Sequence, residues 1–300
     1  MTIALTGATG FVGQAVLDEA ERRGVQVQAL TRRPQPARKG VTWIAGSLDD
    51  RAGLDQLADG TDAMIHVAGL TNAPDAAGFR AANVAGTGNV MAACEDAGVG
   101  RFVFVSSLSA REPRLSDYGA SKAEAEVAVE DSTLDWTIVR PPAVYGPRDG
   151  EMFELFRAAR FGVVPLPPRG RASMIEVSDL ARLLVDLALS KGTRAIYEPD
   201  DGHPEGYTHA ELARLMGAAV GRRAIGLHMP GFVLKAAARA DRAMRGGKAK
   251  LTPDRARYMV HRNWVCDPAR AVPANLWKPR IPAAEGFPAT ARWYREAGWL

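Results

Sequence analysis

Residues 2–13 read TIALTGATGFVG, an apolar run followed by a loop with glycines at positions 7, 10 and 13. The residues after this loop, up to about Arg23, carry apolar side chains at helical spacing. A strand that leads through such a loop into a helix is the context that a dinucleotide-binding glycine motif requires, although glycines also form ordinary turns. The free N–H groups at the helix start suit a pyrophosphate. We therefore expect a cofactor loop made of Gly7, Thr9, Gly10, Phe11, Val12 and Gly13.

Strand-like and helix-like runs alternate through the first half of the chain. The expected strands are residues 3–6, 25–30, 41–45, 63–68, 102–106 and 136–140, and the expected helices are residues 11–23, 75–97 and 118–130. This alternation is typical of an α/β protein with a Rossmann-type, doubly wound parallel sheet. The run Phe102-Val103-Phe104-Val105 fits a strand that is buried on both faces.

The alternation ends after Arg140, where prolines become frequent. A short strand at 175–177 and a helix at 178–189 follow, and later helices at 209–220, 232–245 and 253–261 do not alternate with strong strands. We expect residues 1–145, with about 172–199, to form the cofactor domain. Residues 146–171 and 200–300 then form a smaller, mostly helical substrate cap at the carboxyl edge of the sheet, where open α/β sheets bind ligands.

The end of the second expected strand reads Leu30-Thr31-Arg32-Arg33 and has no acidic residue. An acid at this position accepts hydrogen bonds from the adenosine ribose, whereas an arginine binds a 2′-phosphate. Arg32, helped by Arg33, therefore favours NADP(H) over NAD(H), the alternative being two solvated arginines. Ser47 and Leu48 follow the third strand and are candidate adenine contacts by position alone.

Tyr118 and Lys122 stand four residues apart at the start of a helix, so both side chains lie on one face. A nearby ammonium stabilises a phenolate, which makes tyrosine a usable acid or base. Ser107 follows the buried strand at 102–106 and is placed to donate a hydrogen bond to a substrate oxygen, with Ser109 as the fallback. The alternative is a surface Tyr-Lys pair with serines that serve as turn or cap residues.

Composition argues against several classes of function. The 300 residues have a formal net charge of +4, with 38 basic and 34 acidic residues mixed along most of the chain, which does not favour nucleic acid as a partner. No secretory signal or membrane-spanning apolar run is evident, so we expect a cytoplasmic protein without a transmembrane segment. Cys94, Cys266 and the five histidines lack ligand spacing, so we expect no metal.

Residues 235–257 depart from the mixed charge pattern. They contain eight basic residues against only Asp241 and Asp254. The first interpretation is a solvated helix face. The second is a basic rim that attracts an anionic substrate, or a membrane surface that contacts residues 232–257.

Taken together, these motifs resemble the extended short-chain dehydrogenases/reductases, often labelled NAD-dependent epimerases/dehydratases. The resemblance covers nearly the whole chain and includes residues 6–13, 66–69, 83–87, 106–107, 118–122 and 140–147. It implies that Ser107, Tyr118 and Lys122 carry catalysis, that Ala68 and Gly69 line the cofactor, and that the segment from Pro141 to Val144 passes beside the nicotinamide. It also suggests a homodimer formed through helices 75–97 and 118–130.

Only ten residues separate Ser107 from Tyr118, so a loop that shapes the sugar site of the family's epimerases is missing or rebuilt. This departure moves the resemblance towards 3β-hydroxysteroid dehydrogenases and dihydroflavonol reductases. We expect an NADP-dependent oxidoreductase that exchanges a hydride with a small-molecule secondary alcohol or ketone, with Tyr118 as general acid/base. Two alternatives stay open: a sugar-nucleotide epimerase/dehydratase with internal redox cycling, and a non-catalytic NADP-binding regulator.

Overall fold

The computed structural model describes residues 1–246, 249 and 251–300, which form two compact units. Unit 1 contains residues 1–140, 180–197 and 274–277. Unit 2 contains residues 141–179, 198–273 and 278–300. Each unit has its own hydrophobic core. The domain limits expected from the sequence stay a prediction, because compactness does not test whether a segment folds on its own.

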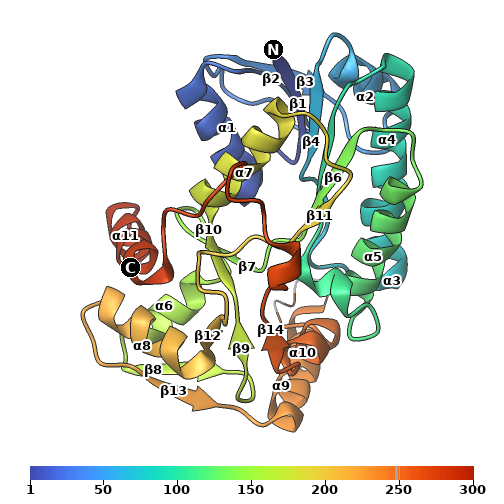
Figure 1. The fold of residues 1–300 in the computed structure, drawn as a ribbon. Coiled ribbons are helices and arrows are strands. Elements are labelled where there is room, and N and C mark those ends of the chain that lie inside the picture. The colour runs from blue at the N-terminus through green and yellow to red at the C-terminus, as the bar shows by residue number, and fades with distance from the viewer. Residues whose placement is uncertain (247–248, 250) are drawn as a thin grey trace. The chain divides into compact units, whose positions relative to one another are not determined.

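Unit 1 is built on a seven-stranded sheet in the order β11-β6-β5-β4-β1-β2-β3, with all neighbours parallel (Figure 1). The chain fills one half of the sheet with β1 to β3 and then crosses over to build the other half outward from β4. The direction in which the chain adds strands therefore reverses between β1 and β4. Doubly wound sheets bind their ligands at such a point. The strands are β1 (Thr2–Thr6), β2 (Gln26–Thr31), β3 (Val41–Ala45), β4 (Ala63–His66), β5 (Phe102–Val105), β6 (Trp136–Val139) and β11 (Ile196–Tyr197). The expected fold class is confirmed.

Helices cover both faces of this sheet. Figure 1 shows α1 and α7 on one face and α2, α4 and α5 on the other. The helical segments are α1 (Phe11–Arg23), α2 (Arg51–Ala58), α3 (Ala76–Phe79), η1 (Arg80–Ala85), α4 (Gly86–Ala97), η2 (Leu108–Arg111), α5 (Asp117–Glu130) and, from Leu180 on, α7 (Val177–Leu189). The single helix expected at 75–97 is in fact α3, the π-helical segment η1 and α4, and α2 was not expected.

Burial explains why these strands form. Every residue of β4, β5 and β6 is buried, so both faces of each strand contact the core. Phe102 and Phe104 pack there with residues of α2 and α4, among them Leu54 and Val90. Apolar residues on both faces of a strand are stable only when helices cover both sides, as they do here.

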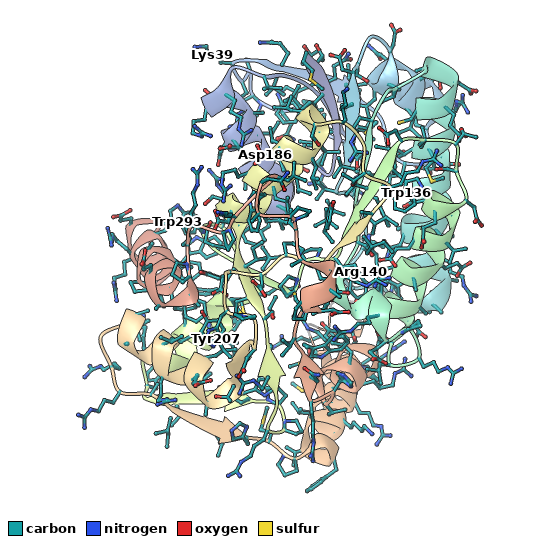
Figure 2. The ribbon with its side chains drawn as sticks, in the orientation of Figure 1. Lys39, Trp136, Arg140, Asp186, Tyr207 and Trp293 are labelled. Carbon is teal, nitrogen blue, oxygen red and sulfur yellow. The ribbon has the colours of Figure 1, made fainter. Side chains whose placement is uncertain are left out.

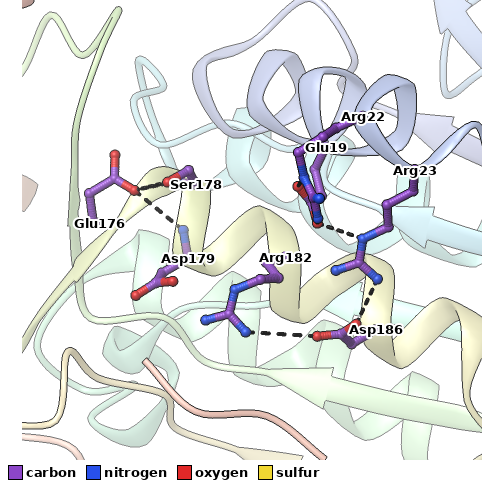
Figure 3. Close-up of polar contacts among 8 residues, drawn as sticks. All are labelled: Glu19, Arg22, Arg23, Glu176, Ser178, Asp179, Arg182 and Asp186. Atoms are coloured by element: carbon purple, nitrogen blue, oxygen red, sulfur yellow. Dashed lines mark hydrogen bonds and ion pairs between the residues drawn. The ribbon is translucent and has the colours of Figure 1, made fainter. Parts of the chain in front are cut away.

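Arg23 ties α1 to α7 on one face of the sheet (Figure 3). Its guanidinium lies 2.5 Å from Glu19 on α1 and 2.7 Å from Asp186 on α7. Arg182 approaches the same aspartate at 4.0 Å. Because these groups are only partly exposed, the pairs position the two helices more than isolated surface pairs do.

Unit 2 combines short strands with helices around an aromatic core. Tyr145 packs edge-on against Phe287, and Phe156 contacts Phe287 and Tyr294. Three small sheets pair as β10-β7, β12-β9-β14 and β13-β8. The elements are β7 (Ala143–Tyr145), α6 (Phe153–Ala159), β8 (Val163–Leu166), β9 (Arg171–Ala172), β10 (Met174–Glu176), β12 (Tyr207–Thr208), α8 (His209–Ala219), β13 (Ile225–His228), α9 (Gly231–Arg245), α10 (Pro253–Met259), β14 (Asn263–Trp264), η4 (Pro268–Arg270) and α11 (Ala283–Glu296).

Among the described residues, no helix combines the length and apolar character needed to cross a membrane. Cys94 and Cys266 are both buried and are not joined in a disulfide within the described residues, and burial raises the pKa of the Cys94 thiol to about 12. Lys248 and Lys250, which belong to the basic segment noted in the sequence, lie outside the described residues.

Candidate functional site

The loop between β1 and α1 can be built only with glycine at its two tightest positions. Gly7 has a φ of +73°, and a Cβ there would lie 2.7 Å from the backbone nitrogen of Ala68. A Cβ on Gly13 would lie 2.1 Å from the carbonyl oxygen of Gly7. The Gly10 N–H donates to that same carbonyl at 3.0 Å and closes the turn. The loop is therefore wrapped closely around the start of α1.

The start of α1 fits an anion. Gly10 is the N-cap and has no side chain to cap the helix, and the first turn contains no acidic residue. The N–H groups of a first turn have no acceptor within their own helix. A diphosphate supplies that acceptor, and the helix dipole favours its negative charge. The glycine loop thus fits the pyrophosphate of a dinucleotide.

The loop after β4 lies against the glycine loop. The Ala68 N–H donates to Thr6 Oγ1 at 3.2 Å. Asn83 holds the same loop from η1: its Oδ1 accepts from the Leu70 N–H at 2.7 Å, and its Nδ2 donates to the Leu70 carbonyl at 3.0 Å. A Cβ on Gly69 would lie 2.8 Å from Asn83 Oδ1. The structure therefore brings Ala68 and Gly69 next to the expected cofactor loop.

Asn83 also reaches α5. Its Nδ2 donates to Ser121 Oγ at 2.9 Å, and that hydroxyl donates to the Tyr118 carbonyl at 2.8 Å. Sequence reasoning from the residues alone left Asn83 as a polar residue in a helix. Its role depends on the π-helical turn of η1, for which the sequence shows no clear signal.

Ser107 and Tyr118 come from two neighbouring segments. Ser107 caps η2, and its Oγ accepts hydrogen bonds from the Ser109 N–H at 3.2 Å and from Ser109 Oγ at 2.9 Å. The first turn of α5 packs on η2, where a Cβ on Gly119 would lie 2.7 Å from the Ser109 carbonyl. Both Ser107 and Tyr118 are half-buried. Ser109, the fallback residue, is buried and supports Ser107.

Lys122 lies one turn after Tyr118 on α5 and is buried. Its Nζ donates to the Val105 carbonyl at 2.8 Å and lies 4.4 Å from the centre of the Phe104 ring. Burial lowers the pKa of Lys122 to about 8, while the negative charge of Glu126 opposes that shift. The amine is therefore still mostly protonated at neutral pH.

Glu126, one further turn along α5, is fully paired in the core. It receives a bidentate contact from Arg140, whose Nε and Nη2 lie 2.9 and 2.6 Å from the two carboxylate oxygens, and Ser106 Oγ donates to it as well. Figure 2 shows Trp136 at the start of β6 and Arg140 beyond its end. This network, which the sequence did not reveal, anchors α5 to the carboxyl ends of β5 and β6.

His66 is the last residue of β4 and lies near Phe104 and Lys122. Its Nδ1 lies 2.6 Å from Thr6 Oγ1, and its Nε2 lies 3.0 Å from Thr87 Oγ1. The ring stacks on Phe104 at 5.7 Å. Complete burial, and secondarily the charge of Lys122, lowers the pKa of His66 to about 3. His66 is therefore a neutral link between β1, β4 and α4.

Arg32 and Arg33 are exposed at the end of β2. Thr31 Oγ1 donates to the Arg33 carbonyl at 2.7 Å and shapes the turn. Within the described residues, neither arginine side chain forms an ion pair, so both guanidinium groups are open to a ligand.

Four further residues were expected to contact the cofactor, two in each unit. Ser47 Oγ donates to Asp49, and Leu48 packs on the start of α4, where a Cβ on Gly86 would lie 2.9 Å from Leu48 Cδ1. Pro141 and Val144 belong to unit 2, and Val144 pairs with β10. Contacts of all four residues with a cofactor stay predictions.

The sequence profile of the NAD(P)H-binding family matches residues 7–191, more than half of the chain. The chain belongs to this family. Its resemblance to the extended short-chain dehydrogenases/reductases is confirmed, and so is its nature as an NAD(P)-dependent enzyme.

Two curated relatives of this NAD(P)H-binding enzyme are reductases. A "Ceramide reductase" from Caulobacter vibrioides is 38% identical over 99% of this chain and 96% of its own length. A "2-alkyl-3-oxoalkanoate reductase" from Stenotrophomonas maltophilia is 32% identical over 74% of this chain and 76% of its own length. Among solved structures, MoeE5 in complex with UDP-glucose and NAD is 25% identical, has a TM-score of 0.76 and covers 99% of both chains.

These matches fit the geometry of unit 1 in this NAD(P)H-binding enzyme. The glycine loop, the uncapped first turn of α1 and the loop with Ala68 and Gly69 all lie at the carboxyl ends of β1 and β4. Ser107, Tyr118 and Lys122 follow from β5 and α5. The residues present therefore fit a nicotinamide dinucleotide.

Proposed function

We propose that this protein is an NADP(H)-dependent reductase that transfers a hydride to a ketone on a long-chain, lipid-like molecule. The observation that carries the proposal is 38% identity to a "Ceramide reductase" over 99% of this chain. The names of both curated reductases describe alkyl-chain substrates with an acyl or oxo group. The short spacing between Ser107 and Tyr118, which moves the resemblance away from the sugar-nucleotide epimerases and towards 3β-hydroxysteroid dehydrogenases and dihydroflavonol reductases, points in the same direction.

The preference for NADP(H) rests on Arg32. It stands at the end of β2, where an acid would select NAD(H), and within the described chain its side chain is in no ion pair. A guanidinium forms charge-assisted, bidentate bonds with a 2′-phosphate. Arg33, the next residue, adds a second positive charge. Both arginines thus favour the phosphorylated dinucleotide.

Ser107 is arranged to donate a hydrogen bond. A serine hydroxyl has one hydrogen and two lone pairs. Ser109 donates to Ser107 Oγ twice, through its N–H and its hydroxyl, so both lone pairs are engaged. The Ser107 hydrogen must therefore point elsewhere, and a substrate carbonyl oxygen is the acceptor that we assign to it.

Tyr118 supplies the proton in this proposal. The nicotinamide, when bound, supplies the hydride. Tyr118 then protonates the substrate oxygen that Ser107 orients. Lys122, one turn away and largely protonated at neutral pH, stabilises the phenolate that remains. Asn83 and Glu126 keep α5 in place through Ser121, Ser106 and Arg140.

Net NADPH oxidation by the purified protein tests the proposal. The panel contains a keto analogue of a ceramide, a 2-alkyl-3-oxo acid, a steroid ketone, a flavonoid ketone and a sugar nucleotide. We expect NADPH to be consumed with the first two substrates, and we expect Tyr118→Phe to abolish this consumption. Conversion of the sugar nucleotide without net consumption would replace the proposal with an internal-redox epimerase. NADPH binding without any turnover would favour a non-catalytic regulator.

A further inference from the structure

The strands β8 and β13 pair as a two-stranded sheet in unit 2 (Figure 1), and this sheet has an exposed apolar face. Val164 and Leu166 of β8 are buried in the core of unit 2. Side chains alternate along a strand, so the intervening residues face away from the core. The parallel register pairs Val163 with Ile225 and Pro165 with Leu227, and all four are exposed. Ile225 is 69% exposed and Leu227 57%.

Exposed apolar side chains continue on both sides of this sheet. Phe161 precedes β8 and is 84% exposed, and Phe232 in the first turn of α9 is 74% exposed. The Met229 N–H donates to the Leu166 carbonyl at 2.9 Å, so α9 starts beside the end of β8. Six of the twelve exposed large apolar side chains in the described residues lie on these strands, just before β8 or in the first turn of α9: Phe161, Val163, Ile225, Leu227, Phe232 and Val233. Such clustering marks an interaction surface.

Basic residues border this apolar face. Residues 221–245 contain six arginines and lysines and one acid, Asp241, which pairs with Arg245 at 3.2 Å. Arg222 and Arg223 directly precede β13, and Lys235, Arg239, Arg242 and Arg245 lie along α9. In α9, Leu234 and Ala238 face the protein, whereas the basic side chains are exposed. The surface thus joins apolar side chains to positive charge.

A groove lies at the edge of this surface. It has a volume of about 520 Å³ and lies between α8 and β13. Alanines and Ile225 form much of its lining, and Arg214, Arg222 and Arg223 add guanidinium groups. A phospholipid has this combination of chemistry: a phosphate that guanidinium groups bind, joined to apolar chains.

We propose that β8, β13 and α9 form a docking surface for an anionic lipid bilayer. Apolar side chains flanked by arginine and lysine are the pattern with which peripheral proteins enter the headgroup region of a membrane. A second copy of this chain would bring like charges together, whereas a bilayer rich in anionic phosphates neutralises them. The docking does not depend on the proposed reductase activity, although it would bring a lipid substrate to the enzyme.

Co-sedimentation of the full-length protein with vesicles tests the docking surface. The vesicles consist of phosphatidylcholine alone or of an equimolar mixture with phosphatidylglycerol. We expect binding to the mixed vesicles at least about tenfold tighter than to phosphatidylcholine, and weakened by added salt. Arg222→Glu with Arg223→Glu, and separately Ile225→Ser with Phe232→Ser, should each weaken that binding about tenfold or more.

Two matched variants in unit 1 serve as controls. Leu189→Ser removes an exposed leucine and Lys39→Glu reverses an exposed charge, and both should leave vesicle binding unchanged. Thermal unfolding and light scattering on every variant check folding and self-association. The docking surface would be refuted if the protein bound equally to both kinds of vesicle. It would also be refuted if the unit 2 variants bound the mixed vesicles as tightly as the wild type does. If the wild type instead self-associates without binding vesicles, and the serine variant loses this self-association, the face would be assigned to contact with a second copy of the chain.

Discussion

At the scale of single residues, the site combines groups that must stay neutral with groups that must stay charged. His66 is buried and neutral, while Lys122 is buried but still protonated at neutral pH because its pKa is about 8. Glu126 and Arg140 neutralise each other one turn beyond Lys122. These neighbours leave the lysine as the cation nearest to Tyr118 on α5.

Tyr118→Phe deletes the proton carrier and leaves the ring. We expect kcat to fall at least about a hundredfold, the usual contribution of a positioned acid or base, with little change in the Kd of NADPH. Steady-state kinetics and nucleotide titration measure the two effects. Tyr197→Phe, at a buried tyrosine of β11, is the matched control. Activity close to wild type in Tyr118→Phe would remove Tyr118 from the mechanism.

Arg32→Ala removes the guanidinium that we assign to the 2′-phosphate. We expect the Kd of NADPH to rise about tenfold or more while that of NADH changes little, because only NADPH carries the phosphate. Fluorescence titration with both nucleotides measures the difference. Lys39→Ala, at another exposed cation of unit 1, should affect neither. Similar losses for both nucleotides would contradict the assignment of Arg32.

At the scale of elements, the carboxyl ends of β1 and β4 are joined by side chains as well as by backbone. Thr6 of β1 contacts His66 of β4, and His66 contacts Thr87 of α4. The same threonine accepts the Ala68 N–H of the next loop. The site is therefore held on rigid elements, which keeps its groups in position.

Stability should decrease as pH falls through the acid range because of His66. Its pKa is about 3 in the folded state and about 6.5 when unfolded, so the unfolded chain binds an extra proton between these values. Each pH unit in this window should cost about 1.4 kcal/mol of unfolding free energy. Urea unfolding at several pH values measures the slope. His66→Gln should flatten it, and an unchanged slope would show that other groups cause the loss.

Gly13→Ala tests the close packing of α1 on its loop. The new Cβ would lie 2.1 Å from the Gly7 carbonyl oxygen, so the loop must move. We expect a loss of about 1–3 kcal/mol in stability and weaker NADPH binding. Gly88→Ala in α4 is the matched control, because beyond the neighbouring helix backbone no atom of the described residues lies within 4 Å of its Cβ position, and alanine favours helix. Calorimetry that finds equal stability for the two variants would contradict this packing.

At the scale of the whole molecule, the two units were predictable to different degrees. Six of the seven strands of unit 1 were expected within about two residues of where they lie, because each is an apolar run bounded by turn residues, whereas the two-residue strand β11 was not expected. In unit 2, β8, β13, α6 and α11 were not expected. β8 and β13 exist because they pair with each other across about 60 residues, and no local pattern reports such a partner.

The sequence by itself determined the α/β fold, the glycine loop and the candidate residues Ser107, Tyr118 and Lys122, because glycine spacing, apolar periodicity and a four-residue offset are local properties. Only the tertiary structure decided that Asn83 holds the loop after β4, that Glu126 pairs with Arg140, and that exposed apolar residues gather beside arginines in unit 2. Each of these depends on burial or on contacts between residues distant in the chain. Such contacts form only when the elements pack.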